Sequence, residues 1–78
     1  MNYVATFYTH AAALLTNRSL QANGHRSQMG PVPRALSSSC GTCVMYTAED
    51  ACLALMDQDV EAVYLVKQNG YETLLKNE

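Results

Sequence analysis

The N-terminal part of the chain has the pattern of a buried strand followed by a helix. Between Asn2 and Tyr8 both alternating sets of side chains are largely apolar, which is typical of a central strand covered on both faces. Thr9 is a favourable N-cap residue and Gly24 a favourable terminator, so a helix is expected from about residue 10 to residue 23. The inner stripe of this helix is predicted to be Ala11, Leu14 and Leu15.

The middle of the chain predicts two further strands, one of them weak. His25–Pro33 contains two prolines, which cannot donate to a hydrogen-bond ladder, so this segment is expected at a sheet edge. Thr42–Thr47 is a short run of β-branched, apolar and aromatic residues and predicts a regular strand.

A second helix is predicted after Thr47, which would be its N-cap, with Asp50 in a capping-box-like position. Apolar residues recur there at the helical positions i, i+3, i+4, i+7 and i+8, and they are Ala48, Ala51, Cys52, Leu55 and Met56. Glu61–Lys67 predicts the last regular strand, and the Gln-Asn-Gly turn after it favours a hairpin that returns the tail as a short extra strand.

This order of elements, β-α-β-β-α-β, predicts the α+β ferredoxin-like sandwich: an antiparallel sheet with strand order 4-1-3-2 and two helices on one face. A chain of 78 residues is too short for two independent cores, so residues 1–78 are expected to form a single domain. The topology places the proline-bearing strand at an edge. It also brings the connection from Pro31 to Cys43 to the end of the sheet where Thr9 and His10 lie.

The amino-acid composition and charge of the chain limit the classes of function that it can have. The chain is 49% apolar and 15% charged, which is normal for a globular protein. Its net charge is −2 and its five cationic residues are scattered, so nucleic acid is not an expected partner. We found neither a basic leader nor an apolar stretch near 20 residues, so we expect no membrane association and a cytoplasmic location. Three cysteines, an odd number, indicate reduced thiols rather than a disulfide framework.

The candidate chemistry is concentrated in the stretch PVPRALSSSCGTC, from Pro31 to Cys43. Cys40 is either a reactive loop thiolate or an incidental loop cysteine, and the nearby helix N-terminus favours an anion there. Cys43 is either a core residue or a second working thiol, whereas Cys52 is expected in the core. Candidate contacts to a substrate or anion, each of which could also be an ordinary surface residue, are His10, Arg34, Ser38, Ser39 and Gly41.

Several alternatives have little support. A zinc site needs four ligands, and Cys40 and Cys43 supply only two, so no metal or cofactor is predicted. The Cys-x-x-Cys pair opens a strand, whereas in thioredoxin-like proteins it opens a helix. In ferredoxin-like metallochaperones it follows the first strand. Transient binding of a soft metal by this pair is left as a weaker possibility.

The Pro-Val-Pro-Arg and Ser-Ser-Cys-Gly elements resemble those of a small bacterial family of selenium/sulfur carrier protein-like domains of unknown function. The resemblance covers most of the chain, including the opening YVATFYT and the Ala-Leu helix, and it departs from the family at Asn17 and Arg18. The matched positions are Pro31, Pro33, Arg34, Leu36, Ser38, Ser39, Cys40 and Gly41.

The resemblance implies a carrier rather than a stand-alone enzyme. Cys40 would accept sulfur or selenium as a persulfide or selenopersulfide from a cysteine desulfurase- or selenocysteine lyase-like donor. It would then pass the atom to an acceptor enzyme, with Cys43 as an optional resolving thiol. The alternative from another class is a non-catalytic interaction module or anion-binding regulatory module.

Overall fold

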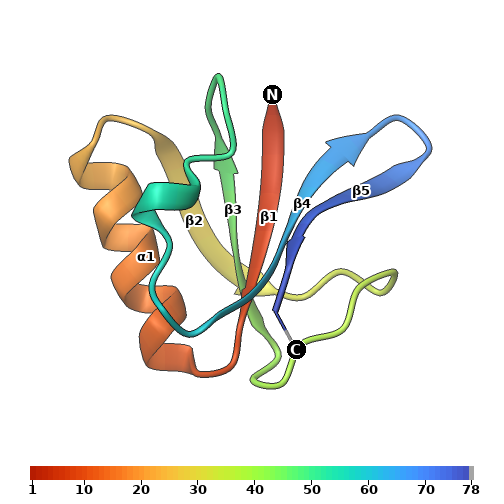
Figure 1. Ribbon diagram of the computed structural model, residues 1–78, viewed down its shortest axis with the longest axis horizontal. Helices are drawn as coiled ribbons and strands as arrows, with labels where there is room; N and C mark the ends of the chain where they lie inside the picture. The colour runs from red at the N-terminus through yellow and green to blue at the C-terminus, as the bar shows by residue number, and fades with distance from the viewer. Residues whose placement is uncertain (78) are drawn as a thin grey trace.

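The computed structural model describes residues 1–77, in which one helix packs on one face of a five-stranded antiparallel sheet (Figure 1). In chain order the elements are β1 (Asn2–Phe7), α1 (His10–Ala22), β2 (Arg26–Pro31), β3 (Thr42–Thr47), the single 3-10 turn η1 (Leu53–Leu55), β4 (Val60–Lys67) and β5 (Gly70–Lys76). The strand order across the sheet is β2-β3-β1-β4-β5.

Strand β1 is central and buried on both faces, as its doubly apolar pattern predicts. It pairs antiparallel with β3 on one side and with β4 on the other. Tyr3, Ala5 and Phe7 belong to the hydrophobic core that the helix covers, and the Tyr3 ring stacks on Tyr46 with centroids 5.2 Å apart. Because side chains alternate along a strand, Thr6 points to the opposite face of the sheet, where it is also fully buried.

The bounds of α1 agree with the sequence prediction to within a residue. The Ala12 N–H donates to Thr9 Oγ1 over 3.1 Å, so Thr9 is the N-cap, and Gly24 follows the helix with a φ of +83°. The predicted inner stripe was wrong, because Ala11 is exposed and Leu15 is 51% exposed. The buried side chains of the helix are instead Ala12, Ala13, Thr16 and Leu20.

Small residues explain this orientation of the helix. Alanines on the inner face let the helix backbone approach the sheet closely, and Leu20 fills the space at the last turn. Thr16 faces inward because its hydroxyl accepts a hydrogen bond of 3.0 Å from the Asp57 N–H. A polar residue thus connects the helix to the segment before β4, which a search for apolar periodicity does not detect.

The predicted second helix is not formed. Residues 48–59 form a loop that contains only η1, because local side-chain bonds compete with helical ones. The Thr47 hydroxyl donates to Asn2 Oδ1 instead of capping a helix, and the Cys52 N–H donates to Asp50 Oδ1 over 2.8 Å. Cys52 also adopts a left-handed φ of +53°, which no right-handed helix contains.

The apolar stripe of this segment is nevertheless packed against the core. Its five members are all partly buried there, and they are Ala48, Ala51, Cys52, Leu55 and Met56. The spacing therefore predicted which side chains face inward, but it predicted the wrong backbone conformation. The Tyr46 hydroxyl, which donates to the Ala51 carbonyl, fixes this loop against β3.

The α+β class is correct, but the expected four-stranded, two-helix layout is not matched. The first four strands keep the relative order 4-1-3-2, with the proline-bearing β2 at one edge. Strand β5 then pairs with β4 through a two-residue turn between Lys67 and Gly70 and becomes the other edge. The tail that was expected as a short extra strand is thus a full member of the sheet.

Within residues 1–77, no helix has the length and apolar character needed to cross a bilayer.

Candidate functional site

Cys40 lies on the connection between β2 and β3, at the lower end of the sheet in Figure 1. The same end holds the last residue of β1 and the first residue of β4, which are paired in the sheet. The base of the connection is closed by a hydrogen bond of 3.3 Å from the Val32 N–H to the Gly41 carbonyl. His10 Nδ1 and Thr42 Oγ1, 3.3 Å apart, join the start of α1 to this loop, as the topology predicted.

The Cys40 side chain is partly buried, so it is less open than a free loop thiol. Its Sγ donates to the Thr42 carbonyl over 3.5 Å and lies 3.9 Å from Ser38 Oγ. One side of the residue packs against the hydrophobic core. This arrangement holds the sulfur in a defined position with a hydroxyl beside it, while part of the side chain stays in contact with solvent.

The serines anchor the loop to the sheet. The Ser38 hydroxyl donates to the Phe7 carbonyl over 3.1 Å, at the end of β1. Ser39 makes two hydrogen bonds to Glu61, one from its N–H and one from its hydroxyl, each 3.1 Å long. Strands β1 and β4 therefore both hold the Ser-Ser-Cys segment in place.

Glu61 was missed as a site residue by the sequence analysis. It was placed at the start of a predicted strand, and the topology puts the start of that strand at the loop's end of the sheet. A carboxylate at the start of that strand is the feature of the sequence that could have indicated a contact with the loop. Arg34, by contrast, is exposed in the loop, and within the described chain no hydrogen bond or ion pair joins it to Cys40.

Cys43 is a core residue. It is fully buried in β3, and its Sγ donates to the Pro31 carbonyl over 3.5 Å. Burial raises the pKa of the Cys43 thiol, and the nearby Cys40 thiolate raises it further. The three cysteines are all free thiols. Cys43 is thus poorly suited to attack a group on Cys40, because its sulfur is sealed from solvent and favours the protonated form.

The raised pKa of Cys43 predicts a loss of stability at alkaline pH. In the unfolded chain this thiol ionises near its ordinary value of 9.0, whereas the folded protein keeps the proton to higher pH. Because the folded state then binds more protons, the free energy of unfolding should fall as pH rises above 9. The steepest contribution is about 1.4 kcal/mol per pH unit. Urea unfolding between pH 7 and 10 measures this slope.

Cys43→Val provides the control for this alkaline prediction. It removes the ionisable group but keeps a small apolar side chain, so its alkaline slope should be shallower than that of the wild type. Cys52 and Tyr46, whose pKa values are also raised by burial, leave a remaining slope in both proteins, with Tyr46 contributing only above about pH 10. Identical slopes in the two proteins would contradict the role of Cys43.

Gly41 follows Cys40 with a φ of +74°, a conformation that side chains rarely adopt. An added Cβ would meet no atom within 4 Å, so Gly41→Ala should cost only backbone strain, about 1 kcal/mol. Gly24→Ala is the matched control, with a φ of +83° and equally open surroundings at the far end of α1. Urea unfolding should give similar losses for both variants. Only Gly41→Ala should change the rate at which iodoacetamide alkylates Cys40, and an equal change in Gly24→Ala would contradict this coupling.

Cys52 is not the helix-face core residue that was expected. It is partly buried in the loop before η1, at the opposite end of the sheet from Cys40, and its Sγ lies 3.6 Å from His25 Nε2. Burial, with smaller contributions from Asp50, raises the pKa of its thiol. No pattern along the chain links Cys52 with His25, because the two positions are 27 residues apart.

Metal ligands and cavities complete the description. Within residues 1–77, no group of three or more His, Cys, Asp or Glu side chains is placed to hold a metal ion. The described structure has two cavities of about 440 and 630 Å³. Pro33 of the β2–β3 connection lines the smaller one, but Cys40 lines neither of them. Cys40 is therefore a partly exposed residue that lies outside both of these cavities.

These features define a class of protein: a small α+β domain that holds a partly exposed thiol on an anchored connection at one end of its sheet. The chain belongs to the family described as "Putative Se/S carrier protein-like", which matches residues 2–73. The family suggested by the sequence resemblance is thereby confirmed. Searches of the curated proteins and of the solved structures gave no match to this chain.

Proposed function

We propose that this protein carries a sulfur or selenium atom on Cys40, as a persulfide or selenopersulfide, between a donor enzyme and an acceptor enzyme. The observation that carries the proposal is the position of Cys40. Cys40 is a partly exposed residue within the Ser-Ser-Cys-Gly element. It lies on the β2–β3 connection, which is hydrogen-bonded to β1 and to β4. Surface loops on a rigid scaffold are well suited to enter the active site of a partner.

The transfer requires no net oxidation. The Cys40 thiol loses its proton, and the thiolate attacks the terminal sulfur of a persulfide on the donor. The sulfur–sulfur bond of the donor breaks, its own thiolate leaves and takes up a proton, and a persulfide remains on Cys40. A nucleophile of the acceptor then attacks the terminal sulfur, and Cys40 leaves as a thiolate. The selenium reaction has the same balance.

Two groups near Cys40 are placed to contact the carried atom. The Ser38 hydroxyl, 3.9 Å from Sγ, can turn its proton from the Phe7 carbonyl toward a thiolate or a terminal sulfur anion. The N-terminal turn of α1 lies beside the loop through the contact between His10 and Thr42, and a helix N-terminus stabilises negative charge. His10 and Ser38 are accordingly proposed as contacts to the carried atom, and Gly41 as the residue that allows close approach.

A one-thiol mechanism is favoured over one that uses Cys43 as a resolving thiol. The Cys43 sulfur is fully buried and donates to the Pro31 carbonyl, so release of the carried atom would first require β3 to open. The same burial weakens the case for soft-metal binding by the Cys-x-x-Cys pair. The anion-binding alternative is also less supported, because both Ser39 donors already bind Glu61.

The proposal is tested with a cysteine desulfurase and cysteine as the sulfur source. After incubation, the intact mass of the wild-type protein should increase by a single sulfur, and alkylation followed by peptide mapping should place that sulfur on Cys40. Bovine serum albumin incubated in parallel, and the protein incubated with cysteine but no desulfurase, control for non-specific sulfuration. Sulfur found mainly on Cys52, or no added sulfur, would contradict the proposal.

A further inference from the structure

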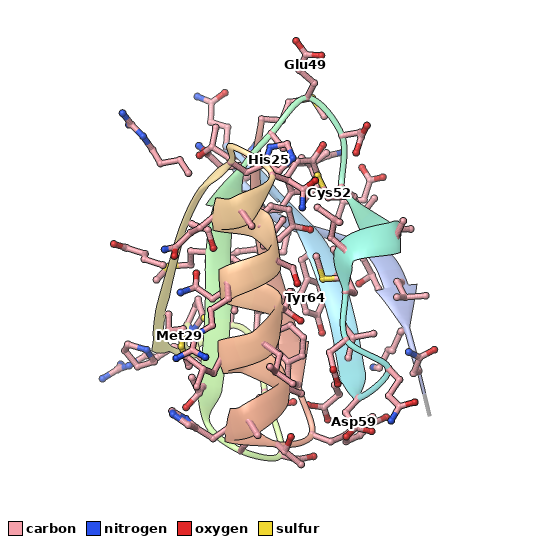
Figure 2. All side chains as sticks on the ribbon, turned by 90° about the vertical axis from the view of Figure 1, so that its left-hand side faces the viewer. His25, Met29, Glu49, Cys52, Asp59 and Tyr64 are labelled. Carbon is pink, nitrogen blue, oxygen red and sulfur yellow. The ribbon has the colours of Figure 1, made fainter. Side chains whose placement is uncertain are left out.

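Cys52 and His25 form a side-chain pair that the proposed carrier function does not use. His25 lies between α1 and β2, and Cys52 lies in the loop before η1. Their Sγ and Nε2 atoms are 3.6 Å apart although 27 residues separate them. Figure 2 shows the two side chains together at the upper end of the molecule, the end opposite to Asp59.

The pair lines a cavity of about 630 Å³. The other lining residues come from the chain start, the end of β3, the loop after it and η1, and they are Met1, Thr47, Ala48, Glu49, Asp50 and Leu55. Two carboxylates therefore flank the pair at the surface. Together with the Met1 ammonium, which donates to the Ala48 carbonyl, the two carboxylates leave a net negative charge, and this charge favours a cation over an anion in the cavity.

We propose that Cys52 and His25 bind a soft monovalent metal cation of the Cu(I) class, independently of Cys40. The donor types fit, since thiolate sulfur selects Cu(I) and imidazole nitrogen suits copper. Metal–thiolate and metal–imidazole bonds of about 2.3 and 2.0 Å can together span up to about 4.3 Å. The observed separation of 3.6 Å is within that reach, so both atoms can bind one ion with little movement.

The number of ligands distinguishes this site from a zinc site. Within the described residues the pair supplies two ligands and no third His, Cys, Asp or Glu completes a set, whereas structural zinc takes four. Binding is a simple exchange: the Cys52 thiol releases its proton to solvent, Cu(I) takes its place on the sulfur, and His25 Nε2 donates a lone pair. The imidazole keeps its proton on Nδ1, and no electron is transferred.

The test uses the full chain with Cys40→Ser as the parent, because Cys40 is itself a thiol that could bind copper. Under anaerobic, reducing conditions, the parent competes for Cu(I) with the coloured bicinchoninate complex. The parent should remove a single equivalent of Cu(I). Adding Cys52→Ser should abolish this competition, and adding His25→Gln should weaken it about tenfold or more. Circular dichroism checks that each variant is folded.

A second measurement needs no change at the site and stays informative if a variant does not fold. In the parent protein, Cu(I) should slow alkylation of Cys52. Cleavage after Arg34 and Glu49 separates Cys52 from Cys43 and makes the protection assignable. Equal competition by the parent and the Cys52→Ser variant, full competition by the His25→Gln variant, or unprotected Cys52 would each overturn the proposal. Loss of sulfur transfer at Cys40 would leave it unaffected.

Discussion

Cys40→Ser should abolish the acceptance of sulfur from a cysteine desulfurase, whereas Cys43→Val should leave it close to the wild-type level. The physical reason is the difference between the two thiols. Cys40 is partly exposed on the anchored loop, whereas Cys43 is fully buried in β3 and its thiol donates a hydrogen bond to the Pro31 carbonyl. A hydroxyl in place of the Cys40 thiol is a poor nucleophile toward a persulfide at neutral pH, so the loss should be complete.

The measurement is the intact mass of each variant after incubation with desulfurase and cysteine, over a time course. Cys52→Ser is the second control, because Cys52 is also partly exposed but lies at the other end of the sheet. It should accept sulfur at the wild-type rate. Undiminished labelling of Cys40→Ser would rule out the carrier role of Cys40, and loss of labelling in Cys43→Val would argue for a two-thiol mechanism.

Leu20→Ala should destabilise the protein by about 3–5 kcal/mol, the range for a large aliphatic side chain removed from a packed core. Leu20 is completely buried at the last turn of α1, where it contacts the core under the sheet. Domains of this size are marginally stable, with unfolding free energies of about 5–15 kcal/mol. A large fraction of the folded state's stability therefore depends on this one side chain.

Leu15→Ala is the matched control, since it makes the same substitution in the same helix. Leu15 is 51% exposed, so its loss should change the free energy of unfolding by less than about 0.5 kcal/mol. Urea unfolding of both variants at neutral pH gives the comparison. A large effect of Leu15→Ala would mean that the helix presents the face predicted from the sequence and not the one described above.

The candidate site was predictable in its centre but not in its surroundings. The loop and its position beside His10 could be stated in advance, because loop composition and strand order are properties of the sequence. The choice of Cys40 rests on the family resemblance and stays a prediction. The contact of Ser39 with Glu61 could not, because it joins positions 22 residues apart whose register depends on the pairing of β1 with β4. The contact between Cys52 and His25 could not be predicted either, because it also joins positions far apart in the sequence.

The failure at the second helix has a local physical cause. The stripe from Ala48 to Met56 has helical spacing, and its members do face the core. However, an Asp50 side chain that bonds the Cys52 N–H and a Thr47 hydroxyl that bonds Asn2 offer the backbone other partners. Such competition is decided by small energy differences, which apolar spacing does not measure.

The sequence by itself determined the strands, the first helix with its Thr9 cap, the edge position of the proline-bearing strand and the family to which the chain belongs. These depend on local propensity, capping and patterning, which act over a few residues. Only the tertiary structure decided which face of α1 is buried, that Ser39 contacts Glu61 and that Cys43 is fully buried while Cys40 is not. These features depend on packing and register between segments that are distant in the sequence. Burying a side chain lowers the free energy of the folded state only when the residues that cover it are already in place.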